Sequence, residues 1–159
     1  MMNVATDFDH FVQCLRESFF ALRRLSEALL APFECTPGER GLLQDLERLG
    51  PQTVPSLAQT RSVARQTMQK IVDRLVQRGW LALVANPRHQ RSWLVAVSPA
   101  GRQLFDRMRA RELELLSSVT LPVPVSELRR ATKTLDALSH FFSTLDVPRQ
   151  ATSTRKRAS

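Results

Sequence analysis

The sequence predicts a mainly α-helical protein that carries one small β-hairpin. Three features indicate this fold class. Apolar residues recur at three- and four-residue spacing along most of the 159 residues, two β-prone runs flank a polar tip, and a basic amphipathic helix directly precedes them. A hydrophobic content of 43% is enough for one globular domain with its own core.

Positive charge is concentrated in one part of the chain. Residues 61–102 hold eight Lys or Arg and one Asp, a local charge of +7, and residues 147–159 add +4. The remaining residues sum to −3, so the total of +8 is local rather than uniform. Such polarisation is expected when one face of a protein neutralises phosphates.

The N-terminal part predicts two helices. The first covers residues 7–30 and ends before Pro32. Its apolar stripe consists of Phe8, Phe11, Val12, Leu15, Phe19, Leu22, Leu25 and Leu29. The second begins after Thr36, which combines with Glu39 as a capping box, and it ends at Gly50.

A short helix over about residues 54–60 and a basic helix that follows Ala64 predict a helix-turn-helix. The stripe of the second helix consists of Met68, Ile71, Val72, Leu75 and Val76. Its turn, residues 61–63, lacks the frequent glycine. Ala64 stands where a Ser or Thr cap would be better by ~1 kcal/mol, so the sequence specifies the helix start only weakly.

The C-terminal half predicts a hairpin and two further helices. Gly79 closes the basic helix, and residues 81–85 and 93–97 are the expected strands. Ser98 and Pro99 open a helix that extends to about residue 118. Ser126 is the expected cap of a final helix, whose stripe consists of Leu128, Ala131, Leu135, Leu138, Phe141, Phe142 and Leu145.

Three motifs carry a family resemblance. They are residues 63–75, VARQTMQKIVDRL, then residues 77–80, QRGW, and after the hairpin residues 98–102, SPAGR. With the surrounding pattern over residues 7–145, they resemble the MarR family of winged helix-turn-helix regulators. The resemblance implies an obligate homodimer with interleaved terminal helices, two recognition helices set for a pseudo-palindromic operator, and a possible ligand cleft between the dimerisation and DNA-binding parts.

The wing departs from the family pattern. Wings of this type usually read Asp-Pro-x-Asp-Arg-Arg, whereas residues 86–91 read Asn-Pro-Arg-His-Gln-Arg. Arg91 is retained, and His89 replaces the acid that often braces it.

The expected organisation is a single domain over residues 1–146. Dimerisation helices occupy residues 7–31 and 102–145, and the winged helix-turn-helix DNA-binding part occupies residues 36–98. The remaining residues, 147–159, have no apolar content to bury, so we expect a basic disordered tail.

Reading bases in the major groove requires donor and acceptor groups near the start of a recognition helix. The residues expected to contact bases are Gln66, Thr67, Gln69 and Lys70. The residues expected to contact phosphates are Arg65, Arg74 and Ser62. A solvated helix face is the alternative interpretation, which the adjacent basic hairpin disfavours.

Arg88 and Arg91 at the hairpin tip suit a narrow minor groove, whose negative potential attracts guanidinium groups. An ordinary soluble turn is the alternative. Asp73, the single acid of the basic segment, is expected to orient Arg74 or Arg91.

The cysteines and aromatic residues carry weaker signals. Some members of the resembled family sense peroxides through a cysteine in the first helix, where Cys14 lies, although burial as a small hydrophobe is the commoner role. Cys35 is expected to be inert. The aromatic residues expected in the core or at a dimer contact, with stacking on a planar ligand as the alternative, are Trp80, Trp93, Phe141 and Phe142.

Other classes of function find no support. The three histidines lie on separate elements without a nucleophile or acid at useful spacing, so an enzyme is not expected. We expect no cofactor and no metal site, because there is no glycine-rich phosphate loop and no CxxC spacing. The chain shows no signal peptide and no membrane span, and the expected compartment is the cytoplasm.

The sequence therefore predicts a homodimeric, sequence-specific binder of double-stranded DNA that acts as a transcriptional repressor. Release by a small-molecule effector of unknown identity, or by oxidation, is part of this hypothesis. The alternatives are a winged-helix module that binds an acidic protein and an architectural DNA binder without operator preference.

Overall fold

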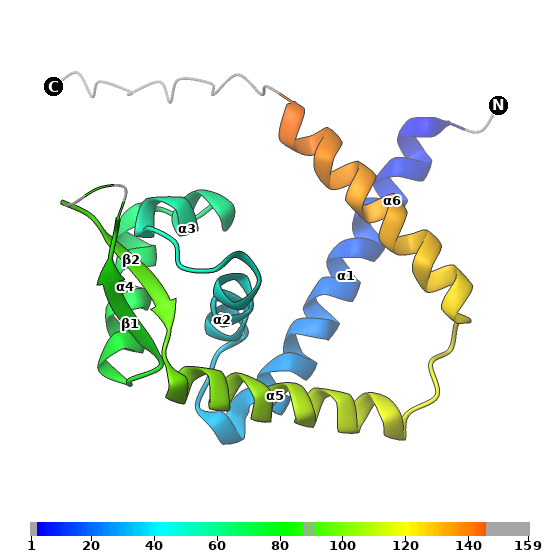
Figure 1. Ribbon diagram of the computed structural model, residues 1–159. Coiled ribbons are helices and arrows are strands. Elements are labelled where there is room, and N and C mark those ends of the chain that lie inside the picture. Colours follow the sequence, from blue (N-terminus) through cyan, green and yellow to red (C-terminus); the bar gives the residue numbers. More distant parts are fainter. Residues whose placement is uncertain (1–2, 88, 90, 146–159) are drawn as a thin grey trace, which may run out of the picture. The chain divides into compact units, whose positions relative to one another are not determined.

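The computed structural model describes residues 3–87, 89 and 91–145 and confirms a mainly helical chain with one antiparallel hairpin (Figure 1). Its elements are α1 (Val4–Leu30), the 3-10 helix η1 (Ala31–Phe33), α2 (Pro37–Leu49), α3 (Val54–Thr60), α4 (Arg65–Gln77), β1 (Leu81–Ala85), β2 (Trp93–Val97), α5 (Pro99–Ser118) and α6 (Val125–Thr144). Contacts divide the chain into two compact units, Met1–Ser118 and Val119–Ser159. Among the described helices, none combines the length and apolar character needed to cross a bilayer.

One hydrophobic cluster joins α2, α3, α4 and the hairpin within the first unit. From α4 it receives Met68, Val72 and Leu75, each at most 1% exposed. Leu43 of α2 and Val95 of β2 are fully buried in the same cluster. Full burial of side chains of this size stabilises the fold by about 1.5–3 kcal/mol each. The cluster therefore fixes which face of α4 remains outside.

The start of α2 has the capping box that the sequence predicts. Thr36 Oγ1 accepts a hydrogen bond from the backbone N–H of Glu39 at 3.2 Å, and the Glu39 carboxylate accepts one from the backbone N–H of Thr36 at 2.8 Å. Glu39 is only 2% exposed. This carboxylate is therefore a buried charge as well as a cap.

Two helices begin at residues other than those predicted. α1 begins at Val4 rather than residue 7, because Asn3 Oδ1 accepts a hydrogen bond from the N–H of Ala5 at 3.2 Å and caps an earlier turn. α6 begins at Val125, with Pro124 at the N-cap and no side-chain cap, so the predicted cap at Ser126 is wrong. The ring of Pro124 allows the extended backbone that precedes a helix.

The turn between α3 and α4 is held by backbone rather than by side-chain caps. The N–H of Val63 donates to the carbonyl of Ala58 at 3.0 Å. Ser62 has φ of 50°, a left-handed conformation that glycine would adopt at lower cost. Ala64 is the N-cap of α4 and makes no side-chain cap bond, as the sequence predicts.

The hairpin is tied to the rest of the first unit along its second strand. Its five residue pairs end with Ala85 opposite Trp93. On the other edge of β2, the N–H of Gln52 donates to the carbonyl of Val95 at 3.0 Å, and the N–H of Val95 donates to the carbonyl of Gln52 at 2.7 Å. Since β1 also packs against α4, the wing has a defined position beside the helix-turn-helix.

The SPAGR motif has a structural explanation. Ser98 Oγ accepts a hydrogen bond from the N–H of Gly101 at 2.9 Å and donates one to the carbonyl of Gly79 at 2.5 Å. A Cβ placed on Gly101 would lie 2.0 Å from the backbone oxygen of Trp80. Glycine is therefore required for α5 to begin against Trp80, in the segment that links α4 to β1.

Apolar side chains remain exposed on both terminal helices, each taken within its own unit. On α1 they are Val4, Phe8, Leu15, Phe19, Phe20, Leu22 and Leu25. On α6 they are Val125, Leu128, Leu135, Phe141 and Phe142. The prediction that Phe141 and Phe142 lie in the core is therefore wrong within this chain. The alternative, that they contact the second subunit of a dimer, stays a prediction. The prediction of a core position is also wrong for Trp93, which is 62% exposed, while Trp80 packs partly buried against the core.

Gly101→Ala should destabilise the protein, because the added methyl group would collide with a backbone carbonyl. We expect the free energy of unfolding to fall by about 1–3 kcal/mol in urea denaturation at fixed protein concentration. Gly38→Ala is the matched control, since an added Cβ there would meet its nearest heavy atom at 3.9 Å. The control should be neutral or stabilising. Equal stability of Gly101→Ala and the unmodified protein would contradict the close approach of α5.

Candidate nucleic-acid interface

The outward face of α4 presents the residues expected to contact bases. Gln66, Thr67, Gln69 and Lys70 are all exposed, whereas Met68 between them is 1% exposed. These four positions lie on one side of the first two helical turns. The structure thus brings them together on an accessible surface, and the contact with bases stays a prediction.

Asp73 has a different partner from the one expected. Its Oδ1 accepts a hydrogen bond from Gln69 Nε2 at 2.8 Å. Among the described residues no ion pair joins Asp73 to an arginine, so its predicted pairing with Arg74 or Arg91 is wrong. The amide of Gln69 retains its oxygen and one N–H, which suffices for a paired contact with adenine.

The N-terminal end of α4 is suited to phosphate. Arg65 and Ser62 are both exposed there. Because Ala64 provides no side-chain cap, the first backbone N–H groups of the helix stay open to an anion. The helix dipole adds a favourable partial positive charge at the same end.

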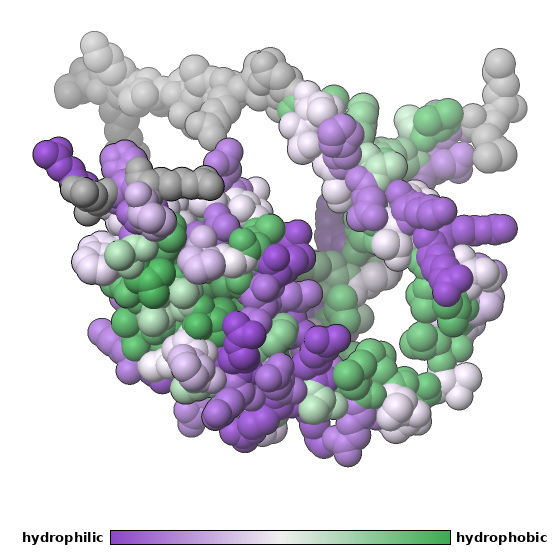
Figure 2. Space-filling view, viewed as in Figure 1, coloured by the Kyte–Doolittle hydropathy of each residue, from purple (hydrophilic) through white to green (hydrophobic). Residues whose placement is uncertain are grey.

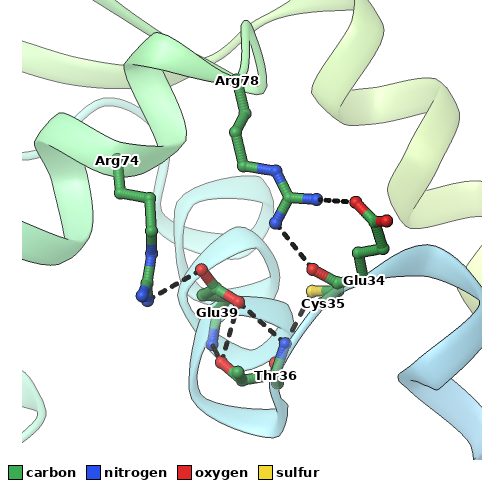
Figure 3. A network of polar contacts seen from close by, with 6 residues as sticks. All are labelled: Glu34, Cys35, Thr36, Glu39, Arg74 and Arg78. Atoms are coloured by element: carbon green, nitrogen blue, oxygen red, sulfur yellow. Dashed lines mark hydrogen bonds and ion pairs between the residues drawn. The ribbon is translucent and has the colours of Figure 1, made fainter.

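Arg74 has a structural partner that the sequence analysis missed. Its Nη2 lies 2.9 Å from Glu39 Oε1, and the side chain points from α4 toward the start of α2 (Figure 3). The contact has the distance of an ion pair without hydrogen-bond geometry, so it is mainly electrostatic. A phosphate at Arg74 would compete with this buried carboxylate, and the predicted phosphate contact stays a prediction.

Arg78 makes a second link between α4 and the segment before α2. Its Nη1 donates to the carbonyl of Glu34 at 2.6 Å, and its Nη2 lies 3.1 Å from the carboxylate of the same residue (Figure 3). The guanidinium also lies over the ring of Trp80, 3.8 Å from the centroid. The adjacent Arg78-Gly79-Trp80 sequence was the only signal for this arrangement.

The wing tip is closed by polar contacts. Asn86 Nδ2 donates to Ser92 Oγ at 2.8 Å, and the N–H of Ser92 donates to the carbonyl of His89 at 3.0 Å. Arg91 is exposed beside these residues. Arg88 lies outside the described residues. The Asn86–Ser92 bond thus joins the two ends of the tip.

The two cysteines differ sharply in environment. Cys14 is exposed on α1, with its Sγ 3.6 Å from Nε2 of His10. Cys35 is buried, and burial, followed by the negative charge of Glu39, raises the pKa of its thiol to about 11. Cys35 is therefore a protonated, unreactive thiol near neutral pH, as expected, whereas Cys14 is accessible. Within the described part of the chain, no cluster of potential ligands could hold a metal ion.

Arg74→Ala should destabilise the protein more than Arg65→Ala. Removing Arg74 leaves the Glu39 carboxylate buried without its cation, at an expected cost of about 1–2 kcal/mol in the free energy of unfolding. Arg65 is exposed on the same helix, so its replacement should change stability by less than about 0.5 kcal/mol. Denaturant unfolding at one protein concentration provides the comparison. Equal stabilities of the two variants would argue against a structural role for the Arg74–Glu39 pair.

Comparisons with known proteins agree with this geometry. A model described as the MarR family matches residues 36–92, from the cap of α2 to the wing tip. The solved structure of a MarR family transcription regulator is 25% identical, with a TM-score of 0.69 over 87% of this chain and 94% of that one. A mutant of MarR from E. coli in complex with operator DNA is 20% identical, with a TM-score of 0.65 over 84% of this chain and 98% of that one.

A third similar structure is Staphylococcus aureus MarR in complex with salicylate and kanamycin. It is 15% identical, with a TM-score of 0.69 over 91% of this chain and all of that one. A search of the curated proteins found no match. The family match across residues 36–92 and the shared fold over most of the chain show that this protein is similar to the MarR family and has its winged helix-turn-helix fold.

Proposed function

We propose that this protein is a sequence-specific repressor that binds a pseudo-palindromic operator as a homodimer. The matching model is described as the MarR family, and a similar solved structure is a MarR family transcription regulator. The observation that carries the proposal is the division of α4, whose inner face is buried while Gln66, Thr67 and Lys70 are exposed at its start. A helix held in this way can place donors and acceptors against base edges without losing its packing.

Charge supports DNA as the partner. Residues 61–102 carry a local charge of +7, and Arg65, Lys70 and Arg91 are all exposed. The uncapped start of α4 can accept one phosphate, and the tip of the wing can place Arg91 in a neighbouring minor groove. The relative that was solved with operator DNA shares this fold.

The exposed apolar residues of the terminal helices support the homodimer. A contiguous apolar surface on a monomer usually marks an interaction site, and α6 has no buried residue within this chain. We assign dimerisation to residues 7–31 and 102–145 and DNA binding to residues 36–98. The cytoplasm is the proposed compartment, since the protein must reach DNA.

A cavity of about 790 Å³ supports control by a small ligand. It lies between the second half of α1 and the start of α2, and its lining includes Phe19, Leu22, Thr36 and Arg61. A ligand there that changed the angle between the terminal helices would change the spacing of two recognition helices. Because dimeric readers need half-sites about one helical turn apart, ~34–36 Å, a small rotation would release the operator.

Oxidation of Cys14 is the second release mechanism that we propose. The thiol is exposed and open to a peroxide, and its Sγ lies 3.6 Å from Nε2 of His10. Cys14 lies on a proposed dimerisation helix, so a polar oxidised sulfur there would act on the dimer rather than directly on DNA.

Selection of duplexes from a random pool tests the main proposal. We expect an inverted repeat with half-sites about one helical turn apart. Gln66→Ala and Lys70→Ala should change base preference at defined positions. Arg65→Ala should weaken binding to all DNA sequences equally. It should also lower the slope of log affinity against log salt concentration by about one.

Each other outcome has a distinct meaning. Salt-dependent binding without sequence enrichment would indicate an architectural DNA binder. Absence of DNA binding would indicate a module for acidic proteins. Selection of sequences that contain only one half-site would contradict binding as a homodimer.

Thiol chemistry tests the oxidation mechanism. At pH 8 iodoacetamide should modify Cys14 quickly and Cys35 slowly, because the Cys35 thiol is buried and its pKa is raised to about 11. Peroxide should release DNA from the unmodified protein and from Cys35→Ala, but not from Cys14→Ser. Full release from Cys14→Ser would remove Cys14 from the mechanism.

A further inference from the structure

Trp93 is a large aromatic residue in an exposed position on the wing. Its side chain is 62% exposed, although it begins a strand whose third residue, Val95, is fully buried. The sequence contains two tryptophans, and the other, Trp80, packs partly buried against the core beneath Arg78. Of the two tryptophans, Trp93 is therefore the one that the wing presents to solvent.

The strand register places Trp93 at the base of the tip. It pairs with Ala85, the last residue of β1, and the next residue toward the tip is Ser92, which is tied to Asn86. A small alanine opposite the indole leaves the ring uncovered on that side. Arg91, two residues before Trp93, is exposed on the tip.

The neighbouring surface of the hairpin is also apolar. Residues directly opposite or two apart in a strand share a face, so Trp93 lies on the same face as Leu83 and Val95. Leu83 is 47% exposed, and Figure 2 shows hydrophobic surface over the two strands, with hydrophilic residues toward the tip. The face of the hairpin that packs on the core at Val95 is thus also apolar where it is exposed, at Leu83 and Trp93. We call these exposed residues the apolar strip of the wing.

We propose that Trp93 packs against the wall of the DNA minor groove beside Arg91 and forms part of the DNA contact. This inference rests on the proposed function. The indole can cover deoxyribose with its ring and donate its N–H to an acceptor at the floor of the groove. Arg91 supplies the charge that draws the wing into the groove, and Trp93 supplies apolar contact once the wing is there.

Charge decides between DNA and other occupants of this strip. The surrounding segment, residues 61–102, carries +7 with Asp73 as its single acid, and Asp73 is bonded to Gln69 on α4. A polyanion with apolar sugar edges matches a tryptophan flanked by arginine. Because β1 packs against α4, entry of α4 into a major groove brings the wing toward the adjacent minor groove.

Tryptophan fluorescence tests the contact directly. The probe is a duplex recovered by selection, with a random mixed-sequence duplex in low salt as a second arm. The Trp93 signal is the emission of the unmodified protein minus that of Trp93→Phe, and Trp80→Phe provides an independent protein with Trp93 as its only tryptophan. In the free protein Trp93 should emit as an exposed indole, and saturating duplex should shift or quench this emission and reduce its quenching by acrylamide.

Affinity measurements separate apolar contact from charge. Trp93→Ala should weaken binding of the selected duplex about tenfold, with an unchanged slope of log affinity against log salt, because indole carries no charge. Arg91→Ala should instead lower this slope by about one. Leu49→Ala, which alters another exposed apolar side chain, is the matched control and should bind as the unmodified protein does.

The possible failures are distinguishable. If labelled duplex binds while Trp93 emission and acrylamide access stay unchanged, this inference is overturned and the proposed function stands. A buried-indole emission in the free protein would also overturn it, since a second copy of the chain would then cover the residue. If no duplex binds the unmodified protein, the proposed function fails and this inference fails with it.

Discussion

Burial of one face of α4 is the constraint on which the candidate interface depends. Met68, Val72 and Leu75 pack into the cluster shared by α2, α3 and the hairpin, and none is more than 1% exposed. A helix has only one orientation about its axis that buries these three positions. That orientation turns Gln66 and Lys70 outward, so the same packing that stabilises the unit also determines which side chains can meet DNA.

Polar contacts between α2 and the helix-turn-helix also hold α4 in this orientation. Glu39 caps α2 and, with the same buried carboxylate, faces Arg74 of α4. A buried carboxylate is costly when unpaired, so displacing α4 from α2 would carry an electrostatic cost as well as a loss of apolar contact. Arg61, in the turn before α4, is similarly bonded to Asp45 of α2 at 2.8 Å. Helix α2 thus holds both ends of the recognition segment.

The start of α4 and the wing contain residues that are poorly suited to their local backbone conformation or to their exposure. Ala64 caps nothing, Ser62 adopts a left-handed conformation, and Trp93 exposes most of its ring. Each departs from what folding alone would favour. All three lie on segments that we propose to contact DNA, and departures from local consistency concentrate at functional sites.

Features that depend on short-range chemistry could be predicted from the order of the residues alone. The capping box of Thr36, the weak start of α4 at Ala64 and the polar outer face of α4 could all be read from residues within a few positions of one another. Three other features required the folded structure: Arg74 faces Glu39, Asp73 bonds Gln69 rather than an arginine, and Trp93 lies outside the core. Periodicity specifies which face of an element is apolar, but it does not specify which residue of another element lies opposite, because that depends on how the elements pack in space.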